Sequence, residues 1–206
     1  MSTSTTDDAT TGAGAAEAGA KRVDPRVRRT RALLRAAVLE LATERDPDTI
    51  TIAHVAERAT VNRATVYQHY RDRDELLLDA MEDELTSLVA LVARCPLVVL
   101  PEAMPQAFAD AFRHVESNVV LYRRMLGPCG SARFNDRLHQ LVAEQVALHL
   151  VDAGLGPREA PGVQLRAQCA AGSFIALLSY WLRGADPLPA DEAAAEAWRA
   201  LQPVAG

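Results

Sequence analysis

Apolar side chains recur along most of the chain at the three- and four-residue spacing of amphipathic helices. A first helix is predicted over residues 25–44, with arginines on its outer side. Val27, Leu34 and Leu41 share its apolar face. Longer helical stripes follow over residues 73–94, 106–126, 131–150 and 163–182, and a last one follows Pro189. We find no internal repeat and no strand pattern, so the sequence predicts an all-α fold.

Two short helices are predicted between residues 51 and 70, separated by a tight turn. Thr51 is well placed to cap the first helix, and Asn62 to cap the second. Helices that cross in a helix-turn-helix need apolar residues at fixed places, and these are supplied by Ile52, Val55, Val61, Val66 and Tyr70. Ala56 is small where the helices would cross closest. The pattern predicts a helix-turn-helix; the alternative is a short amphipathic hairpin inside a helical bundle.

The second short helix carries polar side chains suited to DNA. Side chains of these types donate or accept hydrogen bonds at base edges and phosphates. They are Arg63, Thr65, Gln68 and His69. In the alternative interpretation, these side chains only face water.

Charge is distributed unevenly along the chain. The formal net charge is -5, yet seven basic residues and one acid lie between Lys21 and Arg35. A basic patch on an acidic protein fits contact with a polyanion through one face, although a solvated helix face has the same composition.

One stretch is recognisable as a family signature. The segment from Ile50 to Leu77 closely resembles the DNA-binding signature of the tetracycline-repressor family of regulators. The resemblance implies a three-helix helix-turn-helix head on a helical ligand-binding and dimerisation body. Together with composition, it predicts a disordered N-terminal tail over residues 1–24, a DNA-binding domain over 25–72 and a body over 73–206.

The resemblance also assigns roles to single residues. It implies phosphate contacts for Thr51, Tyr67, His69 and Arg73. It places Asn62, Arg63, Ala64 and Gln68 at the major groove, with Arg63 and Gln68 as the candidates for base readout. Thr65 joins this DNA-binding set. Two residues depart from the family pattern: Thr60 replaces the usual Gly in the turn, and His54 replaces a common acidic residue. A left-handed backbone at Thr60 would cost on the order of 1 kcal/mol or more.

The body resembles one subset of these regulators and is predicted to form a homodimer. In the family, the last two long helices pair across a two-fold axis, and the stripes over residues 138–150 and 163–182 suit that packing. A small-molecule pocket lined by aromatic and apolar side chains is a further expectation. Its candidate residues are Phe112, Tyr122, Met125, Phe174 and Trp181, with plain core as the alternative.

Other chemistry has little support in the sequence. His114, His139 and His149 lack metal-ligand spacing, so neither a metal nor a cofactor is predicted. The three cysteines suggest reduced thiols; Cys129 is the most exposed candidate for redox sensing, and an inert role is favoured. No catalytic constellation indicates an enzyme, and neither a secretory signal nor a membrane span is apparent, which predicts a soluble cytoplasmic protein.

The sequence therefore predicts a DNA-binding transcriptional regulator. The leading hypothesis is a homodimeric repressor of a palindromic operator that a small-molecule effector releases. The alternative is a helical protein-interaction module without specific DNA recognition. An enzyme that uses the body pocket is a third and weaker hypothesis.

Overall fold

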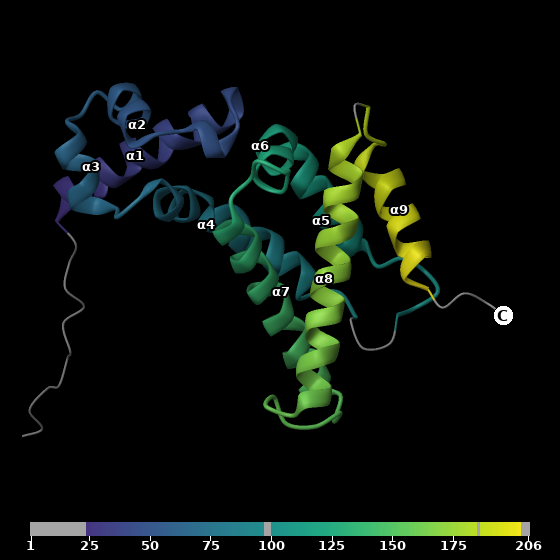
Figure 1. Cartoon of the computed structure of the whole chain (residues 1–206). Coiled ribbons are helices and arrows are strands. Elements are labelled where there is room, and N and C mark those ends of the chain that lie inside the picture. Colours follow the sequence, from purple (N-terminus) through teal and green to yellow (C-terminus); the bar gives the residue numbers. More distant parts are fainter. Residues whose placement is uncertain (1–23, 97–99, 185, 203–206) are drawn as a thin grey trace, which may run out of the picture.

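The computed structural model describes residues 24–96, 100–184 and 186–202, and every regular element in these ranges is helical (Figure 1). The all-α prediction is confirmed. The predicted disordered tail falls, up to residue 23, outside the described residues. Asp24 belongs to the first helix, because its carboxylate accepts a hydrogen bond from the Arg26 amide at 2.8 Å as the N-cap.

The N-terminal helices form a small head. In chain order they are α1 (Pro25–Glu44), the short 3₁₀ turn η1 (Pro47–Thr49), α2 (Ile52–Arg58) and α3 (Arg63–His69). Leu34, Val55 and Val66 are completely buried between them. The caps read from the sequence, Thr51 for α2 and Asn62 for α3, stand where they were expected.

The remaining helices form the body. They are α4 (Arg73–Val92), α5 (Gln106–Ser117), α6 (Val119–Met125), α7 (Ala132–Asp152), α8 (Pro161–Arg183) and α9 (Ala190–Leu201). The long helices α7 and α8 pack against each other. Figure 1 shows the head at one end of α4 and the other helices gathered around its far end.

Helix α4 belongs to both parts of the molecule. It packs against α1 in the head and against α5 and α7 in the body. Its apolar stripe includes Leu76, Leu77 and Met81 near the head and Leu88 and Val92 farther along, all buried. Helix α4 therefore contributes buried side chains to both the head and the body.

Aromatic side chains from three helices fill the body's core between α5, α8 and α9. The ring centroids of Phe108 and Trp198 lie 5.0 Å apart, and those of Phe112 and Trp181 lie 5.2 Å apart. Phe174 lies edge-on to both phenylalanines of α5. These pairs fix how α8 and α9 sit on α5.

Candidate nucleic-acid interface

The first helix of the helix-turn-helix begins with a reciprocal cap. The Thr51 hydroxyl accepts a hydrogen bond from the His54 amide at 3.2 Å, and His54 Nδ1 accepts one from the Thr51 amide at 3.3 Å. An acidic or amide side chain usually completes such a capping box. In this chain the His54 imidazole does so through Nδ1, and it takes the place of the acidic residue common here in the family.

The turn between α2 and α3 has a left-handed backbone at Thr60, whose φ is 55°. The Thr60 amide donates to the Glu57 carbonyl at 3.1 Å, and the Val61 amide donates to the Ala56 carbonyl at 2.9 Å. This pair of bonds is the Schellman motif that ends many helices, usually with glycine at the left-handed residue. The turn keeps the geometry of a glycine turn although a β-branched residue occupies it.

Helix α3 turns one face to the head and the other to solvent. Asn62 Oδ1 accepts a hydrogen bond from the Ala64 amide at 2.9 Å and starts the helix. Val66 is completely buried, which fixes the helix on the head. The predicted major-groove and phosphate residues at the surface are Asn62, Arg63, Ala64, Tyr67 and Gln68, and Tyr67 is 60% exposed. Thr65 and His69 are half-buried at its edges.

The guanidinium of Arg73, a predicted phosphate contact, already has partners within the protein. Its Nη1 donates to the Asp48 carbonyl oxygen at 2.8 Å, and its Nη2 lies 2.8 Å from the Asp74 carboxylate. These contacts join the start of α4 to the turn that precedes α2. A phosphate would have to compete with them, so the resemblance alone overstates the availability of Arg73.

The basic stretch divides into paired and unpaired arginines. Arg31 and Arg35 form ion pairs with α4: Arg31 Nη2 lies 3.1 Å from Asp79, and Arg35 Nη2 lies 2.9 Å from Asp83. In the described part of the chain, the exposed residues Arg26, Arg28 and Arg29 have no acidic partner within 4.0 Å. The positive charge predicted from the sequence is thus concentrated at the start of α1, which Figure 1 shows beside α3.

A polar cluster, which the sequence pattern did not reveal, anchors the end of the recognition helix. The Tyr70 hydroxyl donates to Asp79 Oδ2 at 2.6 Å and accepts from Arg31 Nε at 3.1 Å. Burial and the neighbouring Asp79 carboxylate raise the pKa of Tyr70 to about 12. Since Arg31, Tyr70 and Asp79 lie on α1, at the end of α3 and on α4, the cluster ties all three helices together.

A model of a known protein family matches the sequence of this head. The model described as "Bacterial regulatory proteins, tetR family" matches residues 33–80, which cover most of α1, the helix-turn-helix and the start of α4. The head of this chain is therefore similar to that of the tetR family. Proteins of this family are bacterial regulatory proteins, and the matched segment of this chain contains the helix-turn-helix described above.

Individual relatives agree with the family. An uncharacterised HTH-type transcriptional regulator of Bacillus subtilis (strain 168), YxbF, is 36% identical over 70 residues, which cover 34% of this chain. The matched segment spans only 18% of that relative's length.

Solved structures of tetR regulators share the fold. One from Streptococcus agalactiae 2603V is 22% identical with a TM-score of 0.65, covering 87% of this chain and 97% of its own. One from Rhodococcus sp. RHA1 is 19% identical with a TM-score of 0.56, covering 84% and 94%. Within these regulators, a helix-turn-helix head on a helical body is the common architecture, as in this chain.

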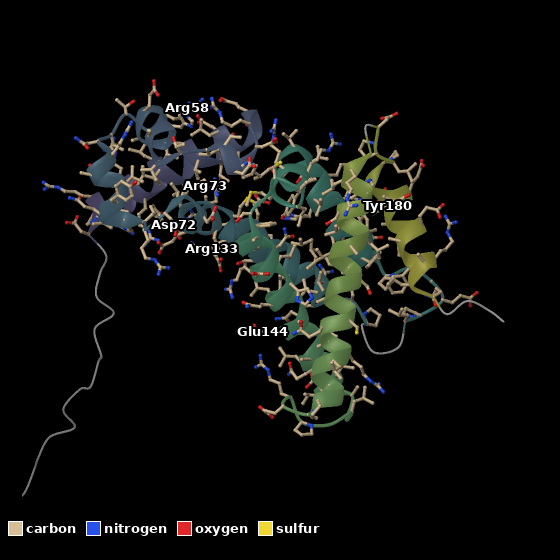
Figure 2. The ribbon with its side chains drawn as sticks, in the orientation of Figure 1. Arg58, Asp72, Arg73, Arg133, Glu144 and Tyr180 are labelled. Carbon is tan, nitrogen blue, oxygen red and sulfur yellow. The ribbon has the colours of Figure 1, made fainter. Side chains whose placement is uncertain are left out.

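Further ion pairs position the head. The Arg58 guanidinium makes two hydrogen bonds to Glu44, at 2.7 and 2.8 Å, and lowers the pKa of that carboxyl. Arg58 thereby holds the end of α2 on α1. At the other side of the head, Arg133 of α7 lies 2.7 Å from Asp72, the N-cap of α4 (Figure 2).

The predicted effector-pocket residues line different pockets or lie in the core. Tyr122 and Met125 are completely buried core residues, and the Tyr122 ring lies 6.4 Å from that of Phe134. Phe112 and Trp181 line an open groove of about 730 Å³ between α8 and α9. Phe174 lines a different cavity, of about 240 Å³. The five residues therefore do not line one pocket, although the Phe112 ring is in contact with those of Phe174 and Trp181.

The cysteines occupy different surroundings. Cys129 is exposed, and the nearby Asp48 carboxylate raises its pKa, which disfavours the reactive thiolate. Asp46, Asp48 and Cys129 lie together at the surface, where Arg124 Nη1 already pairs with Asp46 at 2.8 Å.

Among the residues that the structure describes, no helix is long and apolar enough to cross a membrane.

Proposed function

We propose that this protein is a homodimeric repressor of the tetR family that binds a palindromic operator in the cytoplasm and is released by a small-molecule ligand. The DNA-binding part of this proposal rests on the solvent-exposed face of α3. Val66 and Tyr70 anchor that helix on the head, which leaves Arg63, Tyr67 and Gln68 exposed together.

Direct readout follows from the chemistry of two side chains on that face. A glutamine suits the N6 and N7 atoms of adenine, and an arginine suits O6 and N7 of guanine. We assign base readout to Gln68 and Arg63. Tyr67, Thr51 and His69 are suited to phosphate contacts through their hydroxyl and imidazole groups.

The start of α1 supplies the electrostatic part of binding. Arg26, Arg28 and Arg29 are exposed at the end of the head that also presents α3 (Figure 1). Each arginine that reaches a phosphate releases counterions, which makes binding weaken as salt rises.

The dimer is proposed to form through the outer face of α7 and α8. Leu165 is 67% exposed and Tyr180 is 79% exposed on α8, and Leu148 is 44% exposed on α7. Exposed large apolar side chains on these two helices are candidates for an interaction site. A two-fold dimer places its recognition helices about one helical turn of DNA apart, roughly 34 Å, or a multiple of it.

Release is proposed to act through α4. A ligand changes operator affinity only by binding one separation of the two heads more tightly than another. The Arg31–Tyr70–Asp79 cluster connects α4 to the end of α3. A shift of α4 in the body therefore changes where the recognition helix lies.

Selection from random duplex DNA tests the proposal. The expected result is an enriched palindrome whose half-sites have the spacing of the dimer, bound by a species with the mass of a dimer in sedimentation. A folded protein that enriches no sequence would refute operator binding and favour the interaction-module alternative. The salt dependence of binding to the enriched DNA then separates phosphate contacts from base contacts.

A further inference from the structure

The body contains an apolar cavity of about 240 Å³ where α4, α5, α7, α8 and α9 meet. Its wall includes Val92 at the end of α4, Phe108 of α5, Val142 of α7, Phe174 of α8 and Trp198 of α9. All five are buried, with at most 7% of their surface exposed. Most of the cavity wall therefore belongs to the core, and Ser173 at its edge is exposed.

The wall offers no charged group to a ligand. Its residues are apolar apart from Cys95, Ser173 and the Trp198 ring nitrogen. Burial raises the pKa of Cys95 to about 11, so its thiol is neutral, and it donates to the Leu91 carbonyl oxygen. Trp198 Nε1 already donates to the Pro101 carbonyl oxygen at 3.2 Å. A charged ligand would lose its hydration here without gaining a partner.

The volume of the cavity and the aromatic rings in its wall limit the class of ligand further. A cavity of about 150 Å³ lined by apolar side chains holds benzene. The present cavity is larger, and two of its rings, Phe108 and Phe174, stand edge to face with centroids 6.2 Å apart. Such rings also favour edge-to-face contact with an aromatic guest. We propose that this cavity binds an uncharged aromatic molecule of about two fused rings.

The position of the cavity gives the ligand a route to the head. Val92 ends α4 and Cys95 follows it, while Asp79 near the other end of α4 bonds to Tyr70 of the head. A ligand that displaces the end of α4 moves this helix relative to the rest of the body. This regulatory consequence rests on the proposed function, whereas binding to the cavity does not.

Fluorine NMR of the full chain tests binding without DNA. The probe is 1-fluoronaphthalene, and its charged counterpart is 4-fluoro-1-naphthoate. Ala170→Leu fills the cavity from the half-buried wall position on α8. Ala200→Leu is the matched control, since Ala200 is exposed and lines the open groove instead. Ser173→Phe, at the exposed edge of the cavity, tests the same prediction without altering a buried position.

We expect a bound fluorine signal for wild type and Ala200→Leu. Ala170→Leu and Ser173→Phe should weaken binding of the probe at least tenfold, with circular dichroism showing native helix content. The naphthoate should bind wild type at least tenfold more weakly than the neutral probe. Absence of a bound signal in wild type, equal binding of the two probes, or full binding by both cavity variants would refute the proposal that this cavity binds an uncharged aromatic molecule.

Operator binding provides the separate test of the regulatory step. With the selected operator, saturating 1-fluoronaphthalene should weaken binding of wild type and leave Ala170→Leu unaffected. An unchanged operator affinity in wild type, with the probe bound, would overturn the action through α4. Failure to select any operator would refute the proposed function, and the NMR result would still decide whether the cavity is a site.

Discussion

Replacement of Thr60 by glycine should stabilise the protein. Thr60 has a φ of 55° in the turn between α2 and α3. A residue with a Cβ in this left-handed region costs roughly 1–2 kcal/mol. Glycine removes that strain, but it also adds freedom to the unfolded chain, which offsets roughly 0.4–1 kcal/mol. The net expected gain in the free energy of unfolding is about 0.5–1 kcal/mol.

Guanidinium denaturation at one fixed protein concentration measures this gain, because dimerisation would otherwise change the apparent stability. The midpoint should rise for Thr60→Gly with an unchanged slope. Thr60→Val is the matched control, since it keeps the β-branched Cβ, and it should show no gain. A glycine variant no more stable than wild type, or a valine variant that gains as much, would refute the strain argument.

Three further predictions concern the anchors of the head and the outer face of the body. The pKa of Tyr70 is raised to about 12, so the folded protein holds this proton more tightly than the unfolded chain, and the free energy of unfolding should fall as pH rises from about 10 to about 12. Tyr70→Phe should reduce this slope in urea titrations across that range, and an unreduced slope would contradict the assignment. Asp72→Ala removes the N-cap of α4 and should cost about 1 kcal/mol in chemical denaturation. Arg133→Ala breaks only an exposed ion pair with Asp72 and should change stability by less than about 1 kcal/mol; an equal loss for both variants would show that the ion pair matters more than the cap. Tyr180→Glu should convert the dimer to monomers in sedimentation while Leu33→Glu, an exposed change on α1, leaves it dimeric, and an intact Tyr180→Glu dimer would place the interface elsewhere.

Local signals made the helix-turn-helix predictable. Thr51 and Asn62 are good capping residues immediately before apolar periodic segments, and both accept the capping hydrogen bonds in the structure. The cost anticipated for a left-handed backbone at Thr60 also applies, because its φ is positive. These features depend on residues within one or two helical turns, which is the range over which a sequence pattern is informative.

Long-range pairing was beyond the sequence pattern. The sequence predicts one basic patch from the arginines of α1, but Arg31 and Arg35 pair with acids of α4 that lie 48 residues away. The same limit applies to Arg73, whose partners Asp48 and Ile50 precede it by 25 and 23 residues. Only the packing of α4 on the head brings these groups together.

The aromatic residues of the body show this limit as well. Phe112, Tyr122 and Phe174 all fit a helical apolar stripe, which does not distinguish core from pocket wall. The structure buries Tyr122 in the core and places Phe174 at the internal cavity. That distinction depends on how far apart α4, α5, α8 and α9 pack, a quantity that periodicity does not encode.

The specificity ratio of Gln68→Ala tests most directly whether α3 reads DNA. Fluorescence anisotropy would compare the affinity for the selected operator with that for a scrambled duplex at several salt concentrations. The expected loss of discrimination is roughly 5- to 150-fold, from about 1–3 kcal/mol for one bidentate base contact. Arg29→Ala, the matched control, should weaken both duplexes alike and reduce the salt slope by about 1. A Gln68→Ala protein that keeps the wild-type ratio would contradict base readout by α3.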